Sequence, residues 1–170
     1  MKYPIGIQDF EKIIEDGYIY LDKTDLVCDL VQNGKIYLLC RPRRFGKSLL
    51  VSTLKCYFEG KKELFKGLSI DKLEKEWKLY PVFHLSFGGQ NYIEPYALEH
   101  VLEEFVARAE LVYGKDELAK TLSSRFRAVL KKAHAKTGMR SVVLIDEYDK
   151  PLLDVMDMDI SVQNEYGKMT

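Results

Sequence analysis

The stretch that decides the fold runs Ile36-Tyr37-Leu38-Leu39-Cys40-Arg41-Pro42-Arg43-Arg44-Phe45-Gly46-Lys47-Ser48-Leu49-Leu50. An apolar run of strand length meets a basic loop, and Gly-Lys-Ser then opens a segment with helical periodicity. This layout is typical of a phosphate-binding P-loop. Backbone N–H groups at the helix start would face the anion, and the helix dipole would add positive potential there. The sequence therefore predicts a phosphate site formed by residues 43–49, with Arg43, Arg44, Phe45, Gly46, Lys47, Ser48 and Leu49 around the ligand.

Two side chains of this loop have a predicted role in nucleotide chemistry. Lys47 would reach the β- and γ-phosphates, and the Ser48 hydroxyl would ligate Mg²⁺. The loop departs from the usual motif because Arg41 stands where a first glycine is expected, and Pro42 stiffens it. Gly-Lys-Ser alone occurs by chance in about one chain in ten of this length, so a solvated lysine at an ordinary helix start is the alternative.

A second segment, Ser141-Val142-Val143-Leu144-Ile145-Asp146-Glu147, strengthens the P-loop interpretation. Four consecutive apolar residues indicate a buried parallel strand. Open α/β sheets bind their ligands at the carboxyl ends of the strands, where Asp146 and Glu147 would lie. Asp146 has the predicted role of a Walker B acid that holds Mg²⁺, and Glu147 that of the base for the attacking water. In isolation the pair would indicate only a solvated strand end.

Composition allows one soluble domain with a real core. Lys plus Arg equals Asp plus Glu at 26 each, so polyanion affinity has to be local, and Arg41, Arg43 and Arg44 form the compact basic lip that could supply it. No apolar run reaches membrane-spanning length, and the three cysteines have neither disulfide nor zinc spacing. We therefore expect a cytoplasmic protein with no membrane segment and with Cys28, Cys40 and Cys56 as reduced, buried thiols.

The remaining pattern predicts helices and strands around these motifs. An N-terminal helical segment, residues 1–34, precedes the P-loop strand at 35–40. Further helices are expected at 47–58, 95–113 and 116–138, with Asp116 capping the last of these and Leu118 facing inward. A helical connection is expected at 61–80 and a strand at 81–87, which Gly88 and Gly89 end.

Several strings of this sequence resemble the predicted AAA-ATPase-like family of bacteria, whose members often carry a C-terminal PD-(D/E)XK nuclease-type domain. The strings are Pro4–Phe10, Tyr20–Thr24, Arg41–Ser48, Tyr57–Gly60 and Leu144–Pro151. The resemblance covers nearly the whole chain, and it makes Arg41 a family trait. It implies an α/β P-loop NTPase of the additional-strand, AAA-like class, a parallel sheet flanked by helices, with ATP and Mg²⁺ as ligands.

The resemblance also implies an incomplete domain. Relatives of this kind continue past the Walker B strand with a sensor strand, which lies between it and the P-loop strand, and with the nuclease-like domain. We therefore expect residues 1–170 to be a C-terminally truncated single domain whose sheet has a gap, unless the two strands pair directly or another chain fills the slot. Unpaired strand edges would favour self-association, which leaves a homo-oligomer open.

Three functional hypotheses follow from the sequence. The first is Mg²⁺-dependent ATP hydrolysis that drives an unknown partner process, with little turnover from these 170 residues alone because they offer no sensor residue or arginine finger. The second is a non-hydrolysing module that binds a nucleotide, or a polyanion such as nucleic acid through the arginine lip. The third is a fragment with no autonomous activity.

Overall fold

The fold is described from a computed structural model, and the description covers residues 2–40, 42 and 45–156. The chain forms two compact units. Of the described residues, those from 2 to 82 and from 139 to 144 belong to the first unit, and those from 83 to 138 and from 145 to 156 belong to the second. Each unit is described by itself below.

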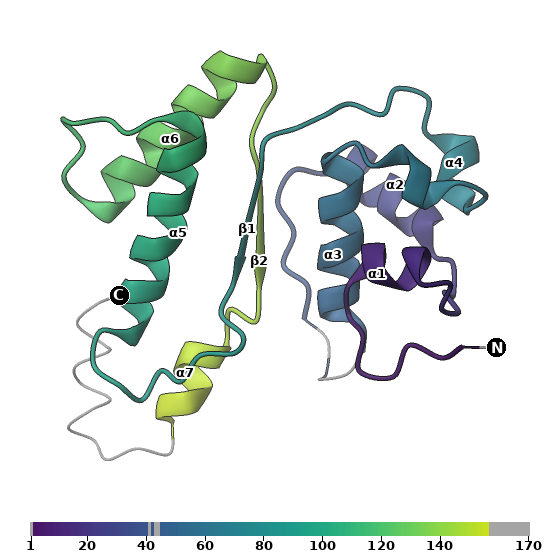
Figure 1. The fold of residues 1–170 in the computed structure, drawn as a ribbon, viewed down its shortest axis with the longest axis horizontal. Coiled ribbons are helices and arrows are strands. Elements are labelled where there is room, and N and C mark those ends of the chain that lie inside the picture. Colours follow the sequence, from purple (N-terminus) through teal and green to yellow (C-terminus); the bar gives the residue numbers. More distant parts are fainter. Residues whose placement is uncertain (1, 41, 43–44, 157–170) are drawn as a thin grey trace. The chain divides into compact units, whose positions relative to one another are not determined.

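The first unit is helical and is built around α3, the helix that begins at Lys47. Its elements are α1 (Phe10–Glu15), α2 (Thr24–Asn33), α3 (Lys47–Phe58), the 3₁₀ turn η1 (Lys62–Phe65) and α4 (Ser69–Leu73) (Figure 1). Asp9 caps α1, because its Oδ1 accepts a hydrogen bond from the Lys12 N–H at 3.0 Å. The α1, α2 and α3 helices share one apolar core, whose buried members include Phe10, Val27, Tyr57, Phe65 and Ile70. Trp77 packs on Tyr57 and Phe65 and so covers one side of this core.

The second unit contains the helices α5 (Ala97–Tyr113), α6 (Leu122–Thr137) and α7 (Lys150–Val155). The strands β1 (Val82–Ser86) and β2 (Val142–Asp146) pair in one two-stranded sheet, and each ends within this unit. The Pro81 carbonyl accepts from the Val142 N–H at 2.9 Å, and the Asp146 carbonyl accepts from the Phe87 N–H at 3.1 Å. This register makes the pair parallel, so both strands finish at the same edge of the sheet.

One face of β1 is covered by the α5–α6 hairpin (Figure 1). Phe83 is buried against Ala109, Val129 and Ala133 of these helices, and Leu85 is buried with Phe87 and Tyr92 in a neighbouring cluster. The alternating burial of β1 places His84 and Ser86 on the exposed face. Helices packed on a small parallel sheet constitute a mixed α/β fold, which confirms the predicted fold class at that level.

The prediction of a P-loop strand at 35–40 is wrong, because these residues form no strand in the structure. In that part of the chain the sheet contains β1 and β2, and residues 35–40 lie outside it. The side chains of Ile36 and Leu38 are 94% and 74% exposed, so the apolar run is not buried here. A strand needs a neighbour for its backbone N–H and C=O groups and a covered face for its side chains, and local hydrophobicity supplies neither.

Three smaller expectations also need correction. The last long helix begins at Leu122, not at Asp116, because Thr121 and Ser124 form a capping box while Asp116 begins a turn in the loop before it. Leu118 lies in that loop and is exposed. Cys28 and Cys56 are buried as expected, but Cys40 is exposed because its segment has no covered face.

In the part of the chain that the structure describes, every helix is too short or too polar to cross a lipid bilayer.

Candidate functional site

Five of the predicted phosphate-binding residues, Phe45 to Leu49, lie at the start of α3. Gly46 has φ 73° and ψ 23°, a left-handed conformation in which glycine carries no steric cost. The first helical hydrogen bond runs from the Leu50 N–H to the Gly46 carbonyl at 3.0 Å. The N–H groups of Lys47, Ser48 and Leu49 therefore precede the first helical bond and lie at the positive end of the helix dipole.

The core of the first unit holds α3 in place behind these groups. Leu49 packs against that core, and the Leu49 carbonyl accepts a hydrogen bond from the buried Thr53 hydroxyl at 2.8 Å. The Ser52 hydroxyl accepts from the Phe10 N–H at 2.9 Å, which fixes the start of α1 on α3. A helix start that is anchored in this way is preorganised, because it needs no reordering when an anion arrives.

The other predicted loop residues divide into two groups. Phe45 is exposed just before Gly46, and Lys47 and Ser48 are half-buried in the first turn of α3. Arg41, Arg43 and Arg44 lie outside the described residues, so the basic lip stays a prediction.

The predicted metal-binding and catalytic carboxylates belong to the second unit, at the end of β2. Asp146 is the last residue of the strand and is buried, and its Oδ1 accepts a hydrogen bond from the Glu147 N–H at 3.0 Å. Glu147 adopts φ 54°, which is uncommon for a residue with a side chain and marks a sharp turn out of the strand. The Glu147 carbonyl accepts from the Lys150 N–H at 3.0 Å, and this turn leads into α7.

The residues after the carboxylate pair have a structural role. The Lys150 ammonium pairs with Asp154 one turn further along α7, and Asp149 is the residue that precedes the helix. Asp154 also accepts a hydrogen bond from the Tyr92 N–H at 3.2 Å, so α7 is tied to the loop that follows β1. Pro151 lies in the first turn of α7, where its missing N–H costs nothing.

Sequence reasoning missed one residue at this edge, Gly88. A side chain there would collide with the Glu147 carboxylate, since an added Cβ would lie 2.7 Å from Oε2. In the sequence, Gly88 and Gly89 indicate only the end of a strand. The contact with Glu147 depends on the pairing of β1 with β2, for which the sequence pattern carries no signal.

In each unit, taken by itself, the donor groups fit the ligand that the sequence predicts. Backbone N–H groups, a lysine and a hydroxyl at a helix start suit a phosphate, and a buried carboxylate at a strand end is a hard oxygen ligand for Mg²⁺. The structure brings Phe45 to Leu49 together in the first unit and Asp146 with Glu147 in the second.

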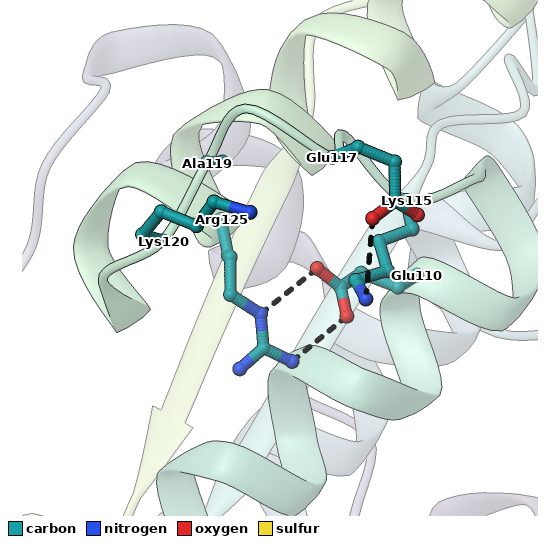
Figure 2. A pocket seen from close by; sticks show the side chains of 6 residues that line it. All are labelled: Glu110, Lys115, Glu117, Ala119, Lys120 and Arg125. Atoms are coloured by element: carbon teal, nitrogen blue, oxygen red, sulfur yellow. Dashed lines mark hydrogen bonds and ion pairs between the residues drawn. The ribbon is translucent and has the colours of Figure 1, made fainter.

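A separate polar cavity of about 320 Å³ lies beside the loop between α5 and α6 (Figure 2). Figure 2 shows Arg125 directed toward Glu110, with which it forms two hydrogen bonds at 3.0 and 2.8 Å. Arg125 also pairs with Glu103. Its charge is thus already matched within the chain, and the cavity contains none of the predicted site residues. Arg125 joins α6 to α5 through these bonds.

The buried thiols are also structural. Burial raises the pKa of the Cys56 thiol to about 11, and it raises the pKa of Cys28 as well. Thiols with raised pKa values are protonated at neutral pH and react slowly as nucleophiles. Among the described residues no cluster of His, Cys, Asp and Glu has the arrangement of a metal site.

The parallel strand pair, the helices on its face and the glycine–lysine helix start define a mixed α/β protein with a candidate phosphate site. The family described as Predicted AAA-ATPase matches residues 4–170, and the chain belongs to this family. It is also 43% identical over 154 residues to the "Uncharacterized protein in vnfD 5'region" of Azotobacter chroococcum mcd 1. That match covers 90% of this chain and 30% of the length of the relative. No solved structure matches the chain.

Proposed function

We propose that this protein binds ATP at the start of α3 and hydrolyses it with the help of Mg²⁺. The observation that carries the proposal is the left-handed Gly46 followed directly by Lys47 and Ser48 in the first turn of α3. Membership of the predicted AAA-ATPase family supports an ATPase-like function.

The residues of each unit have a distinct task in this proposal. Lys47 and the N–H groups from Phe45 to Leu49 bind the phosphates, with Arg43 and Arg44 adding positive charge. Ser48 of the first unit and Asp146 of the second are the residues that the sequence motifs assign to a magnesium ion, and each would supply an oxygen ligand. Mg²⁺ supplies charge neutralisation at the phosphoryl oxygens when it is bound. The Glu147 carboxylate, which directly follows the end of β2, accepts a proton from the attacking water. Conformational changes that accompany ATP binding and hydrolysis would drive a process in a partner molecule.

The test of nucleotide binding is the thermal stability of the protein with saturating Mg-ATP. A ligand that binds only the native state stabilises it by about 2.7 kcal/mol at a hundred times its Kd. Lys47→Ala should abolish this shift. Lys55→Ala is the matched control, since Lys55 lies on the same helix and makes only a long ion pair with Glu59 at 4.0 Å. An unchanged shift in Lys47→Ala would exclude the P-loop assignment.

The second candidate function is binding of nucleic acid or another polyanion without hydrolysis. The sequence feature that favours it is the density of arginines at positions 41, 43 and 44. Binding of this kind weakens steeply with salt, because each neutralised phosphate releases counterions. A titration with single- and double-stranded DNA between about 50 and 200 mM salt separates the two functions. A protein that makes six to ten phosphate contacts loses about 10³ to 10⁵ in DNA affinity over this range.

A further inference from the structure

The parallel register of the strands brings residue 88 beside residue 147. The Asp146 carbonyl accepts a hydrogen bond from the Phe87 N–H at 3.1 Å, so β1 and β2 end at the same position along the sheet. Gly88 follows Phe87 and Glu147 follows Asp146. The two residues are therefore neighbours across the sheet although 59 positions separate them in the sequence (147 − 88).

The backbone of Glu147 is fixed on both sides. Its N–H donates to Asp146 Oδ1 at 3.0 Å, and its carbonyl accepts from the Lys150 N–H at 3.0 Å. With φ at 54°, this turn sets the direction in which the Glu147 side chain leaves the main chain. The remaining freedom of the carboxylate lies in its own side-chain torsions.

The Glu147 carboxylate occupies the space that a side chain at position 88 would need. A Cβ added to Gly88 would lie 2.7 Å from Oε2, 3.0 Å from Cδ and 3.2 Å from Oε1 of Glu147. Gly88 is not among the positive-φ glycines, unlike Gly89 with φ 77°. A side chain at position 88 would therefore displace the Glu147 carboxylate, whereas the backbone conformation at 88 is open to residues other than glycine.

From this contact we propose that Gly88 is a positioning residue for Glu147: the absence of a side chain at position 88 lets the carboxylate lie where it acts on the attacking water. The inference rests on the proposed function of Glu147 as the base. A methyl group at 88 would strike only the far end of a flexible side chain. The strand would stay intact, and the carboxylate would move away from the site of chemistry.

The kinetic test compares Gly88→Ala with Gly89→Ala in the full-length natural protein. Gly88→Ala should lower kcat for ATP at least tenfold, toward the value for Glu147→Gln, and leave the KM for ATP within twofold. A positioned general base is worth about 10² to 10⁴ in rate, so a displaced one costs a measurable part of this. Gly89→Ala is strained because of its positive φ, but its Cβ would meet nothing within 4 Å. It should lower Tm and leave kcat per folded molecule unchanged.

A second readout needs no nucleotide. In the Glu147→Ala background, Gly88→Ala should raise Tm, since the collision is gone and alanine has a less disordered unfolded state than glycine. With Glu147 present the same change should raise Tm less or lower it. If Gly88→Ala changes Tm equally with and without the Glu147 side chain, the proposed contact is overturned. If Gly88→Ala leaves kcat unchanged while Glu147→Gln is inactive, the positioning role is overturned. If the parent protein binds no ATP, the proposed function fails, while the Tm comparison still decides the contact.

Discussion

The Asp22 carboxylate accepts two hydrogen bonds from Ser69, one from its N–H at 2.7 Å and one from its hydroxyl at 2.8 Å. The other carboxylate oxygen accepts from the N–H of Thr24 at 2.9 Å and from its hydroxyl at 2.7 Å. The Thr24 hydroxyl in turn accepts from the Ile70 N–H at 3.1 Å. The family-like string Tyr20–Thr24 thus joins the start of α2 to the start of α4, which gives it a role in folding the first unit.

Asp22→Asn should destabilise the protein at neutral pH by about 1.5 to 3 kcal/mol, the range for hydrogen bonds to a charged group. Burial alone would raise the pKa of the Asp22 carboxyl, but the hydrogen bonds from Thr24 and Ser69 outweigh it and lower the pKa to about 2. Because the unfolded value is about 3.9, this stabilisation is present above pH 4 and is lost as the pH falls toward 2. Urea unfolding at pH 7, 4 and 2.5 measures the difference.

The control for this prediction is Asp25→Asn, because Asp25 is an exposed acid in the first turn of the same helix. It should cost only a few tenths of a kcal/mol through the helix dipole. A stability difference between Asp22→Asn and the parent that stays constant from pH 5 to 2.5 would contradict the lowered pKa of Asp22.

Arg125→Met should cost about 3 kcal/mol of stability, the lower end of the range for a broken buried ion pair. Glu110 is only 8% exposed, and the hydrogen bond from Arg125 is the main reason why its pKa is lowered. Removal of the guanidinium leaves this carboxylate buried and unpaired. Chemical denaturation measures the loss, and Arg125→Met combined with Glu110→Leu should recover most of it.

The exposed pair of Arg108 and Glu104 on α5 provides the comparison, with side chains 76% and 61% exposed. Arg108→Met should change stability by less than about 0.5 kcal/mol, because water screens the pair. Equal losses in Arg125→Met and Arg108→Met would show that the α5–α6 network contributes no more than a surface ion pair.

The features that the sequence predicts well depend on neighbours along the chain. The Asp9 cap, the start of α3 after Gly46, its end before Gly60 and the end of α6 at Gly138 are all local signals, and the structure has them. The strand β2 was also predictable from its β-branched run, although Val143 and Ile145 are exposed, so it is not buried on both faces.

The features that were predicted wrongly or missed depend mostly on contacts between parts of the chain that are distant in sequence. Residues 35–40 have the hydrophobicity of a strand, but a strand also needs a partner that this pattern does not specify. Asp116 and Thr121 are both good capping residues, and only Thr121 has Ser124 placed to complete a capping box. The Gly88–Glu147 contact follows from the register of two strands, which periodicity does not determine.

Arg43→Glu should weaken ATP binding at least tenfold if the basic lip contacts the phosphates. Arg41, Arg43 and Arg44 repel one another, so we expect one of them, Arg41 or Arg44, to pair with an acid of the same chain and Arg43 to face the ligand. Arg127→Glu is the control, since it makes the same charge change on the exposed surface of α6. Fluorescence titration of a labelled nucleotide at several salt concentrations measures the affinity and its salt dependence.

The outcome of the Arg43 experiment also separates the two candidate functions. If the lip binds nucleic acid, Arg43→Glu should leave ATP binding intact and reduce the slope of log K against log salt for DNA by about one per lost phosphate contact. Unchanged binding of both ligands would make the arginine lip purely structural.

Glu147→Gln should retain ATP binding and lose ATP hydrolysis. Glutamine keeps the shape of the side chain and the turn at φ 54°, but it is not a base, so a loss of about 10² to 10⁴ in kcat is expected with little change in Kd. Asp146→Asn provides the contrast, because weakened metal binding should raise the Mg²⁺ concentration needed for half-maximal ATP binding. Phosphate release and isothermal titration with Mg-ATP measure the two quantities on the same preparations. Equal loss of binding and turnover in Glu147→Gln would instead assign Glu147 to the metal site or to the fold, and would leave the base to be found elsewhere.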